Sequence, residues 1–381
     1  MTVKHPANLI YNKRTSKIYK LASLVLLFFS IQAFAQPDVN YVRMDEYLKL
    51  YPDQAPIVDA FTQQVRLKAI PLSQKQTRPV RIAVIYPAHQ ASDYWRRSVI
   101  SFEARLKELS INYILTPFFS RPSVDLVLQS KQLNQALAWQ PDYLVFTLDA
   151  LKHRRMIERV LARGKPKLIL QNITTPLRQW SKHRPFFYVG FDHAKGTRLL
   201  AKHMLKKAGY SGNYLLLYFS PGYVSTMRGD TFATEAAKHK NIRQIASYYT
   251  NGNKERARNA TLRTLEKHND LKFIFASSTD IALGVIEALK ESGQLGQIMV
   301  NGWGGGTAEL QALNAGELDL TVMRINDDNG VAMAEAIKLD LEDQSSRVPH
   351  VYSGDIELIN HGVDHKEVEN LKERAFRYSR P

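Results

Sequence analysis

"VRIAVIYPAHQASDYW", residues 80 to 95, places a continuous apolar run before a polar loop and the aromatic start of an expected helix. An apolar run without alternation is typical of a strand that is covered on both faces, as in parallel sheets. Similar runs follow, with helix-like segments between them, at 112–116, 142–148, 166–172, 186–191, 213–219, 245–250, 272–277, 297–302 and 318–325. We therefore expect an α/β fold with two doubly wound parallel sheets of about five strands each.

The N-terminus has the pattern of a secretory signal peptide over residues 1–35. Basic residues extend to Lys20, an apolar run follows at 21–31, and small residues precede an expected cleavage after Ala35. Eleven apolar residues are too few to cross a bilayer, which takes about 20. The alternative is a retained membrane anchor. The pattern predicts export to the periplasm, with a mature chain that does not span the membrane.

Composition narrows the classes of function. The formal charge is +16, of which the first 35 residues carry five positive charges and no negative ones, leaving about +11. Basic residues form no sustained run, and the densest patch, "KHRR" at 152–155, is expected on a solvated helix face rather than on nucleic acid. The chain has no cysteine, which excludes thiol catalysis and thiolate metal sites.

Enzyme motifs are also missing: we find no G-x-S-x-G, no H-E-x-x-H and no phosphate-binding G-x-x-x-x-G-K-[ST]. An NADP-type oxidoreductase is the serious enzymatic alternative, because "GWGGGT" at 302–307 follows an expected strand and Arg324 lies about twenty residues further on. That fingerprint belongs to the first strand of a domain, whereas here it follows the fourth strand of the second sheet. We therefore expect a binding protein, not an enzyme, without a metal or cofactor.

The residues that follow the expected strands indicate the ligand, because ligands bind at the carboxyl ends of such strands. They are rich in hydroxyls and amides, with two Trp and two Arg, which suits a polyhydroxylated ligand carrying negative charge. Arg228 could instead pair with Asp230, and Arg324 with Asp327 or Asp328. For Trp95 and Trp303 the alternative to ligand binding is packing in the core. Core packing is less expected for Trp303, because its flanking glycines offer no side chains to pack against.

Several motifs carry a resemblance to a known family. They include "YPAHQASDYW" (86–95), "LILQNITTP" (168–176), "RGDTF" (228–232), "STDIALG" (278–284), "NGWGGG" (301–306) and "DLTVMR" (319–324). From about residue 40 to its end, the chain resembles type I periplasmic binding proteins of the ribose-binding kind. Within these it is most similar to the LuxP family, periplasmic receptors for the quorum-sensing signal autoinducer-2.

The resemblance implies two lobes joined by a three-crossing hinge, with the ligand clamped between them. The implied domains are a signal peptide (1–35), a helical lead-in (36–77), a first lobe (78–192 with about 326–348) and a second lobe (193–325 with about 349–381). The implied ligand-binding residues are Gln90, Ser92, Trp95, Thr147, Asn172, Arg228, Thr279, Trp303 and Arg324. Asp280 resembles sugar-binding acids of the wider fold but could equally cap the helix that follows it.

In that family the ligand is the furanosyl borate diester of autoinducer-2, whose boron carries a negative charge, and the partner is the periplasmic domain of a LuxQ-type sensor histidine kinase. Two arginines suit such an anion, because a buried unpaired charge is costly. The alternative function as a binding protein is that of a pentose-type sugar-binding component of a transporter. His89 could add pH sensitivity near the ligand, or could simply lie at the surface.

Overall fold

The computed structural model describes residues 40–380. The predicted signal peptide lies outside this range. The described part begins with two helices, α1 (Met44–Leu50) and α2 (Gln54–Arg66), which match the expected helical lead-in from residue 40 onward.

The first sheet has six parallel strands in the order β11-β5-β4-β3-β1-β2. Their bounds are β1 (Val80–Tyr86), β2 (Tyr113–Phe119), β3 (Tyr143–Thr147), β4 (Lys167–Gln171), β5 (Phe187–Phe191) and β11 (Val351–Gly354). Every residue of β3 and β5 is buried. This explains why their sequences are apolar throughout instead of alternating.

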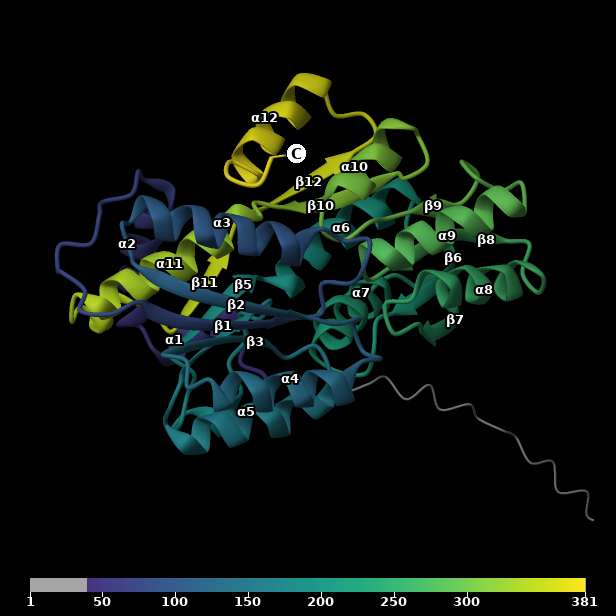
Figure 1. Ribbon diagram of the computed structural model, residues 1–381. Helices are drawn as coiled ribbons and strands as arrows, with labels where there is room; N and C mark the ends of the chain where they lie inside the picture. The colour runs from purple at the N-terminus through teal and green to yellow at the C-terminus, as the bar shows by residue number, and fades with distance from the viewer. Residues whose placement is uncertain (1–39, 381) are drawn as a thin grey trace, which may run out of the picture. The chain divides into compact units, whose positions relative to one another are not determined.

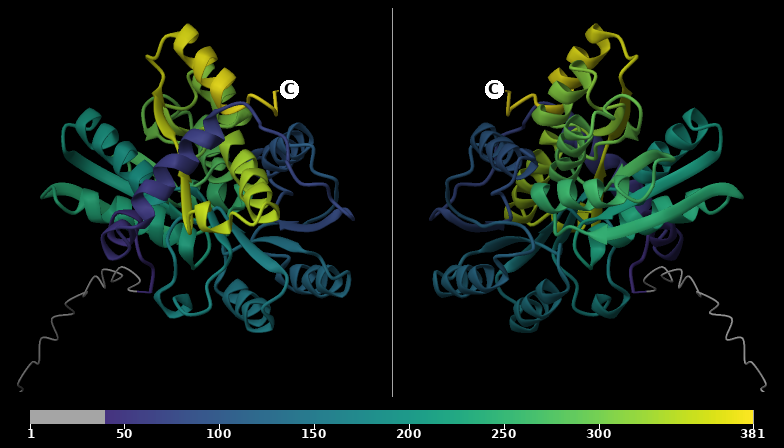
Figure 2. Two further views of the ribbon diagram at one scale, coloured as in Figure 1. Left: turned by 90° about the vertical axis from the view of Figure 1, so that its left-hand side faces the viewer. Right: turned by 90° about the vertical axis from the view of Figure 1, so that its right-hand side faces the viewer.

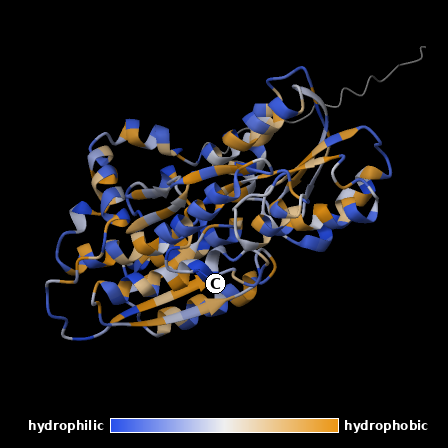
Figure 3. Cartoon of the chain, turned by 90° about the horizontal axis from the view of Figure 1, so that it is seen from above, coloured by the Kyte–Doolittle hydropathy of each residue, from blue (hydrophilic) through white to orange (hydrophobic). Residues whose placement is uncertain are grey.

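Helices cover both faces of this sheet. One face packs on α4 (Leu126–Ala138) and α5 (Leu151–Arg163), and the other on α2, α3 (Tyr94–Glu108) and α11 (Asp327–Leu341), as Figure 1 shows. Side chains alternate along β1: Ala83 and Ile85 join the buried cluster of α4 and α5, whereas Ile82 and Val84 join that of α3 and α11. Figure 3 shows hydrophobic strands between helices whose outward residues are hydrophilic.

The second sheet has four parallel strands in the order β7-β6-β8-β9. Their bounds are β6 (Ser211–Tyr218), β7 (Asn241–Tyr249), β8 (Leu271–Ala276) and β9 (Met299–Val300). Helices α8 (Lys254–Leu265) and α9 (Thr279–Glu291) share a buried cluster with one face, and α6 (His193–Lys207) and α7 (Thr231–Ala236) with the other. The predicted arrangement of helices on both faces is confirmed.

Strand β10 (Leu320–Arg324) departs from the prediction of five parallel strands in this sheet. It pairs antiparallel with β12 (Ile356–Asn360), while two parallel bridges, Asn301–Leu320 and Gly304–Met323, join it to the segment at the end of β9. The remaining elements are α10 (Thr307–Asn314), α12 (His365–Ala375) and the short helices η1 (Arg178–Trp180), η2 (Ser225–Asp230) and η3 (Ser345–Arg347).

We call the first sheet with its helices the first lobe, and the second sheet with β10 and β12 the second lobe. The chain passes between them after β5, after β10 and between β11 and β12. We expected residues 349–381 to belong to the second lobe. For β11 this was wrong, because Val351–Gly354 pairs in parallel with β5 of the first lobe. Figure 2 shows α2 beside α11, so two segments far apart in the sequence both contribute to the first lobe. Among the described helices, none combines the length and hydropathy needed to cross a membrane.

Candidate functional site

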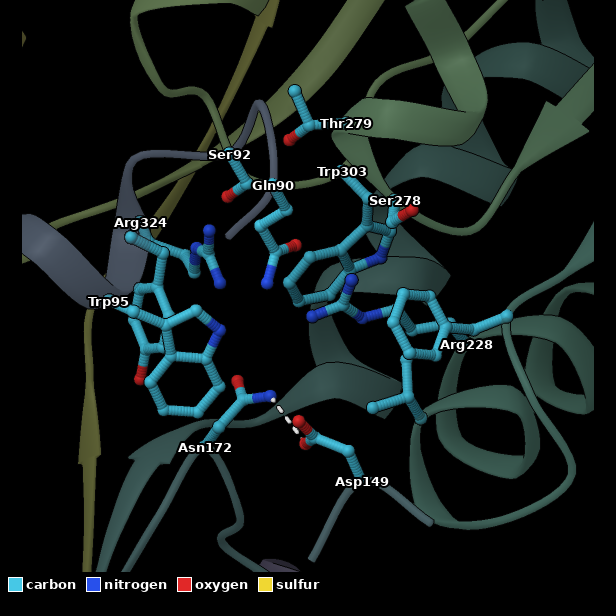
Figure 4. A pocket seen from close by; sticks show the side chains of 13 residues that line it. Gln90, Ser92, Trp95, Asp149, Asn172, Arg228, Ser278, Thr279, Trp303 and Arg324 are labelled. Atoms are coloured by element: carbon cyan, nitrogen blue, oxygen red, sulfur yellow. Dashed lines mark hydrogen bonds between the residues drawn. The ribbon is translucent and has the colours of Figure 1, made fainter. Parts of the chain in front are cut away.

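A cavity lies at the carboxyl ends of the strands, and both lobes contribute to its wall. Its free volume is about 30 Å³, smaller than that of typical small-ligand sites. Its lining, much of it drawn in Figure 4, consists of Gln90, Ser92, Tyr94, Trp95, Asp149, Asn172, Phe219, Val224, Arg228, Ser278, Thr279, Trp303 and Arg324. Loops after strands bring these residues together, as expected for parallel α/β sheets.

All but one of the predicted ligand-binding residues line this cavity. The exception is Thr147, the last residue of β3, which is fully buried and donates its hydroxyl hydrogen bond to Asp149 Oδ1 at 2.8 Å. Thr147 therefore orients a residue of the wall and does not itself reach the cavity.

Arg228 extends from η2 into the cavity and is 4 % exposed. One guanidinium nitrogen donates to the carbonyl of Ser277 at 2.8 Å, and Nε has no partner within residues 40–380. The alternative ion pair with Asp230 is not formed, since that carboxylate accepts the hydroxyl of Tyr218 at 2.9 Å. Burial, and next the charge of Arg324, lower the pKa of Arg228 well below its usual value.

Arg324 ends β10 at the second crossing between the lobes and is 5 % exposed. Its guanidinium carbon lies 4.1 Å from the ring centroid of Tyr94, and its Nε has no partner in the described part of the chain. The alternative partners are engaged elsewhere: Asp327 with Ser379, and Asp328 with Arg377 at 2.7 Å. Burial lowers the pKa of Arg324 from its usual value.

The balance of charge in the cavity is positive. Two buried guanidiniums are present, and neither joins an ion pair among residues 40–380. The acid in the cavity wall is Asp149, whose pKa burial raises to about 6, opposed by hydrogen bonds from Thr147 and Asn172 and by the charge of Arg228. Behind the wall, the charge of Glu309 partly opposes the lowering of the pKa of both arginines. Buried cations without counter-ions cost free energy, so this arrangement favours a ligand that brings negative charge.

Trp303 is both a wall residue and a core residue. It is 1 % exposed, and its Nε1 donates to the hydroxyl of Thr197 at 3.0 Å. The expectation that its flanking glycines leave it without packing neighbours was wrong, because α6 supplies them: the ring centroid of His193 is 4.9 Å away, and a Cβ added to Gly196 would lie 3.0 Å from the indole. Trp95 is also buried and packs 4.7 Å from the ring of Tyr86.

Five wall residues were not predicted: Tyr94, Asp149, Phe219, Val224 and Ser278. Asp149 and Ser278 each lie two residues after the end of a strand, which is a signal that could have included them. Phe219 and Val224 are apolar and resemble core residues in the sequence. Behind the wall, His193 Nε2 lies 3.1 Å from Asn172 Oδ1, and burial lowers the pKa of this histidine well below its usual value. Burial thus favours the neutral form of His193, whose Nε2 also lies 3.5 Å from a guanidinium nitrogen of Arg228.

His89 and Asp280, for which the sequence left two roles open, both lie outside the cavity wall. His89 is exposed and absent from the cavity wall, so the surface reading is confirmed. The carboxylate of Asp280, in the first turn of α9, accepts hydrogen bonds from the backbone of the first lobe, at Ala91 and Ser92, as well as from its own N–H. Across residues 40–380, no group of three or more acidic or histidine side chains could hold a metal ion.

The comparison with protein families gives one match, a periplasmic binding protein domain spanning residues 82–345. The chain belongs to this family. Periplasmic binding proteins bind solutes and are not enzymes, which agrees with the expected class of function. The matched region extends from β1 to η3, so it includes the cavity wall contributed by both lobes.

Individual relatives of this periplasmic binding protein are distant. The ribose import binding proteins RbsB of Escherichia coli (strain K12) and Salmonella typhi are each 26 % identical over 183 residues, which cover 48 % of this chain and 60 % of theirs. The match thus spans less than two thirds of the length of these curated relatives.

Solved structures agree in fold. A solute-binding protein from Agrobacterium vitis with bound alpha-D-tagatopyranose has a TM-score of 0.67 at 18 % identity, covering 77 % of this chain and 98 % of that one. Another from Actinobacillus succinogenes 130z, with bound D-allose, has a TM-score of 0.63 at 20 % identity, covering 77 % of this chain and 100 % of that one. At such identities the likeness concerns the fold alone.

Proposed function

We propose that this periplasmic binding protein is a receptor of the LuxP type, which binds the borate diester of autoinducer-2 between its lobes. In this proposal the closed state acts on the periplasmic domain of a LuxQ-type membrane sensor kinase. The observation that carries the proposal is the pair of buried guanidiniums, Arg228 and Arg324, which face one cavity without a carboxylate partner among the described residues.

The chemistry of a borate diester complements this wall. Its tetrahedral boron carries a full negative charge, which the two guanidiniums can neutralise through charge-assisted hydrogen bonds. Its hydroxyl and ring oxygens can accept from the amides of Gln90 and Asn172, and its hydroxyls can donate to Asp149. The indoles of Trp95 and Trp303 border the cavity and can cover the apolar face of a small ring.

A ligand that touches both lobes favours the closed state by its difference in affinity between closed and open forms. Ser92 and Asn172 belong to the first lobe, whereas Arg228 and Thr279 belong to the second. A ligand held by all four therefore links its own binding to closure. The kinase then needs to distinguish only closed receptor from open receptor.

The second candidate is a sugar-binding component of a transporter. It is supported by the names of the relatives, which are ribose import proteins, and by the sugars in the titles of the solved structures. Asp149 supports it as well, since a carboxylate is a good acceptor for a sugar hydroxyl. The charge of the ligand distinguishes the two candidate functions. A borate diester neutralises the guanidiniums, whereas a neutral pentose leaves both without a counter-charge.

The deciding experiment is the identification of the ligand that the protein carries. Purified protein is heated to release its ligand, and the supernatant is analysed for boron by elemental mass spectrometry and for organic compounds by molecular mass spectrometry. We expect boron and the autoinducer-2 skeleton in equal amounts. Ribose or another neutral sugar without boron overturns the receptor proposal and supports the transporter component.

A further inference from the structure

Two carboxylates reach across the gap between the lobes in opposite directions. Asp93 precedes α3 in the first lobe and contacts the second, whereas Asp280 lies in the first turn of α9 in the second lobe and contacts the first. Neither side chain lines the cavity. Their contacts therefore require no ligand atom.

Asp280 binds the loop that carries two candidate ligand-binding residues. Its Oδ1 accepts the backbone N–H of Ala91 at 2.8 Å and its Oδ2 that of Ser92 at 3.2 Å. Ala91 stands between Gln90 and Ser92, which both line the cavity. The carboxylate thus fixes the backbone from which these two side chains extend.

Asp93 binds the start of α10 in the second lobe. Its Oδ2 accepts from the backbone N–H of Thr307 at 3.2 Å and from the hydroxyl of Thr307 at 2.8 Å. Arg97 joins the contact, donating to Asp93 at 2.7 Å and to the Thr307 hydroxyl at 2.9 Å. The carboxylate of one lobe therefore occupies the position of a capping group on a helix of the other.

Gly306, the last glycine of "NGWGGG", makes room for this contact. A Cβ added there would lie 2.3 Å from Asp93 Oδ1, closer than non-bonded atoms approach. The carboxylate cannot easily move aside, because Arg97 and Thr307 both hold it. A side chain at position 306 would therefore act as a wedge between the lobes.

We propose that Asp93 and Asp280 form a reciprocal latch, which stabilises the closed arrangement of the lobes through contacts that need no ligand atom and makes Asp280 a positioning residue for Gln90 and Ser92. The inference rests on the proposed function only for the role of those two side chains in ligand binding. The latch itself consists of contacts between protein groups.

The test measures the separation of the lobes in ligand-free protein. Because the chain has no cysteine, single cysteines introduced at the exposed positions Lys131 in α4 and Glu255 in α8 accept spin labels, and double electron–electron resonance reports the distance distribution. We expect the doubly labelled parent to be mostly open without ligand, with a detectable short-distance population. Asp280→Asn and Gly306→Ala should shift most of it to longer distances, because Asn offers one acceptor to two N–H donors and Ala creates the wedge.

A matched control is Glu266→Gln, which removes one exposed charge from the same lobe and should leave the distribution unchanged. If Asp280→Asn fails to fold by circular dichroism, Thr307→Val serves instead, since it deletes the hydroxyl that binds Asp93 and Arg97. A ligand-free parent with no short-distance population, or variants that keep the parent's distances, overturn the proposal.

A second measurement separates this inference from the proposed function. The probe is autoinducer-2 mixed with borate, and Asp280→Asn should raise its dissociation rate about tenfold, as expected for the loss of one hydrogen bond to a charged group. An unchanged rate contradicts the positioning role of Asp280. If the parent does not bind this probe, the receptor proposal fails, while the distance measurement still decides the latch.

Discussion

The guanidinium of Arg228 lies over the indole of Trp303, with 3.6 Å between its central carbon and the ring centroid. A cation over an aromatic face gains about 2 kcal/mol or more when both groups are desolvated. This contact and the bond to Ser277 hold the side chain in place but supply no negative charge. The arginine is therefore oriented by the protein and left to be neutralised by a ligand.

Replacing either arginine should weaken binding of borated autoinducer-2. Arg228→Ala and Arg324→Ala each remove a charged hydrogen bond worth roughly 1.5 to 3 kcal/mol, so the dissociation constant should rise about 10- to 150-fold. Isothermal titration calorimetry measures it, with the exposed Arg256→Ala as the control. Unchanged affinity in both variants contradicts the role of the two guanidiniums.

The two buried arginines, Arg228 and Arg324, should lower the free energy of unfolding of the ligand-free protein. Burial and mutual repulsion disfavour the two cations, as the lowered pKa of Arg228 indicates. Arg228→Met keeps an unbranched apolar side chain and removes one charge, so the free energy of unfolding should increase by on the order of 1 kcal/mol. Urea denaturation without ligand checks this. A loss of stability would mean that the contact with Trp303 outweighs the cost of burying the charge.

Trp303→Ala should reduce both stability and binding. Because the indole is 1 % exposed and packs against α6, its removal should cost about 3 to 5 kcal/mol of unfolding free energy. Trp303→Phe retains a ring and loses the hydrogen bond to Thr197, so it should cost less and keep measurable binding. Calorimetric melting and ligand titration separate the two effects. An unchanged melting temperature in Trp303→Ala argues against its core role.

Asp149 should make stability depend on pH in a defined window. Burial raises its pKa to about 6 from 3.8, so the folded protein retains this proton between these values while the unfolded chain loses it. Its contribution to stability is therefore fully present below about pH 4 and is lost as pH rises to about 6. A shift of this size corresponds to about 3 kcal/mol.

The measurement for Asp149 is the difference in unfolding free energy between Asp149→Asn and the parent. The variant should gain relative stability as pH rises from 4 to 6 and then reach a plateau. Taking the difference removes the opposite effect of His153, whose pKa burial lowers to about 4 and which is present in both proteins. A difference that does not vary with pH would mean that Asp149 ionises normally in the folded state.

The parts of the fold that could be predicted are those with continuous apolar runs. β1, β3 and β5 are buried on both faces, so their sequences differ clearly from the surrounding loops. The strands that were missed have weaker signals: β11 is four residues long, and most of β12 is only partly buried. Their placement depends on the crossings between lobes, which no local pattern encodes.

The site was predictable where a residue closely follows a strand, as Asn172 follows β4 directly and Thr279 lies three residues after the end of β8. Chain position does not reveal which direction a side chain takes, and for that reason Thr147 was assigned to the ligand although it bonds to Asp149. Contacts between distant segments were equally hidden. The partners of Asp280 lie about 190 residues earlier in the chain.

The order of the strands also has a consequence for biosynthesis. β11 pairs with β5, and α11 packs on α3, so the first lobe obtains one edge strand and part of one helical layer from residues 327–354. Its core cannot be completed until nearly the whole chain has been made. A nascent chain truncated before residue 327 retains exposed apolar surface on β1 and α3, which keeps the first lobe from folding early.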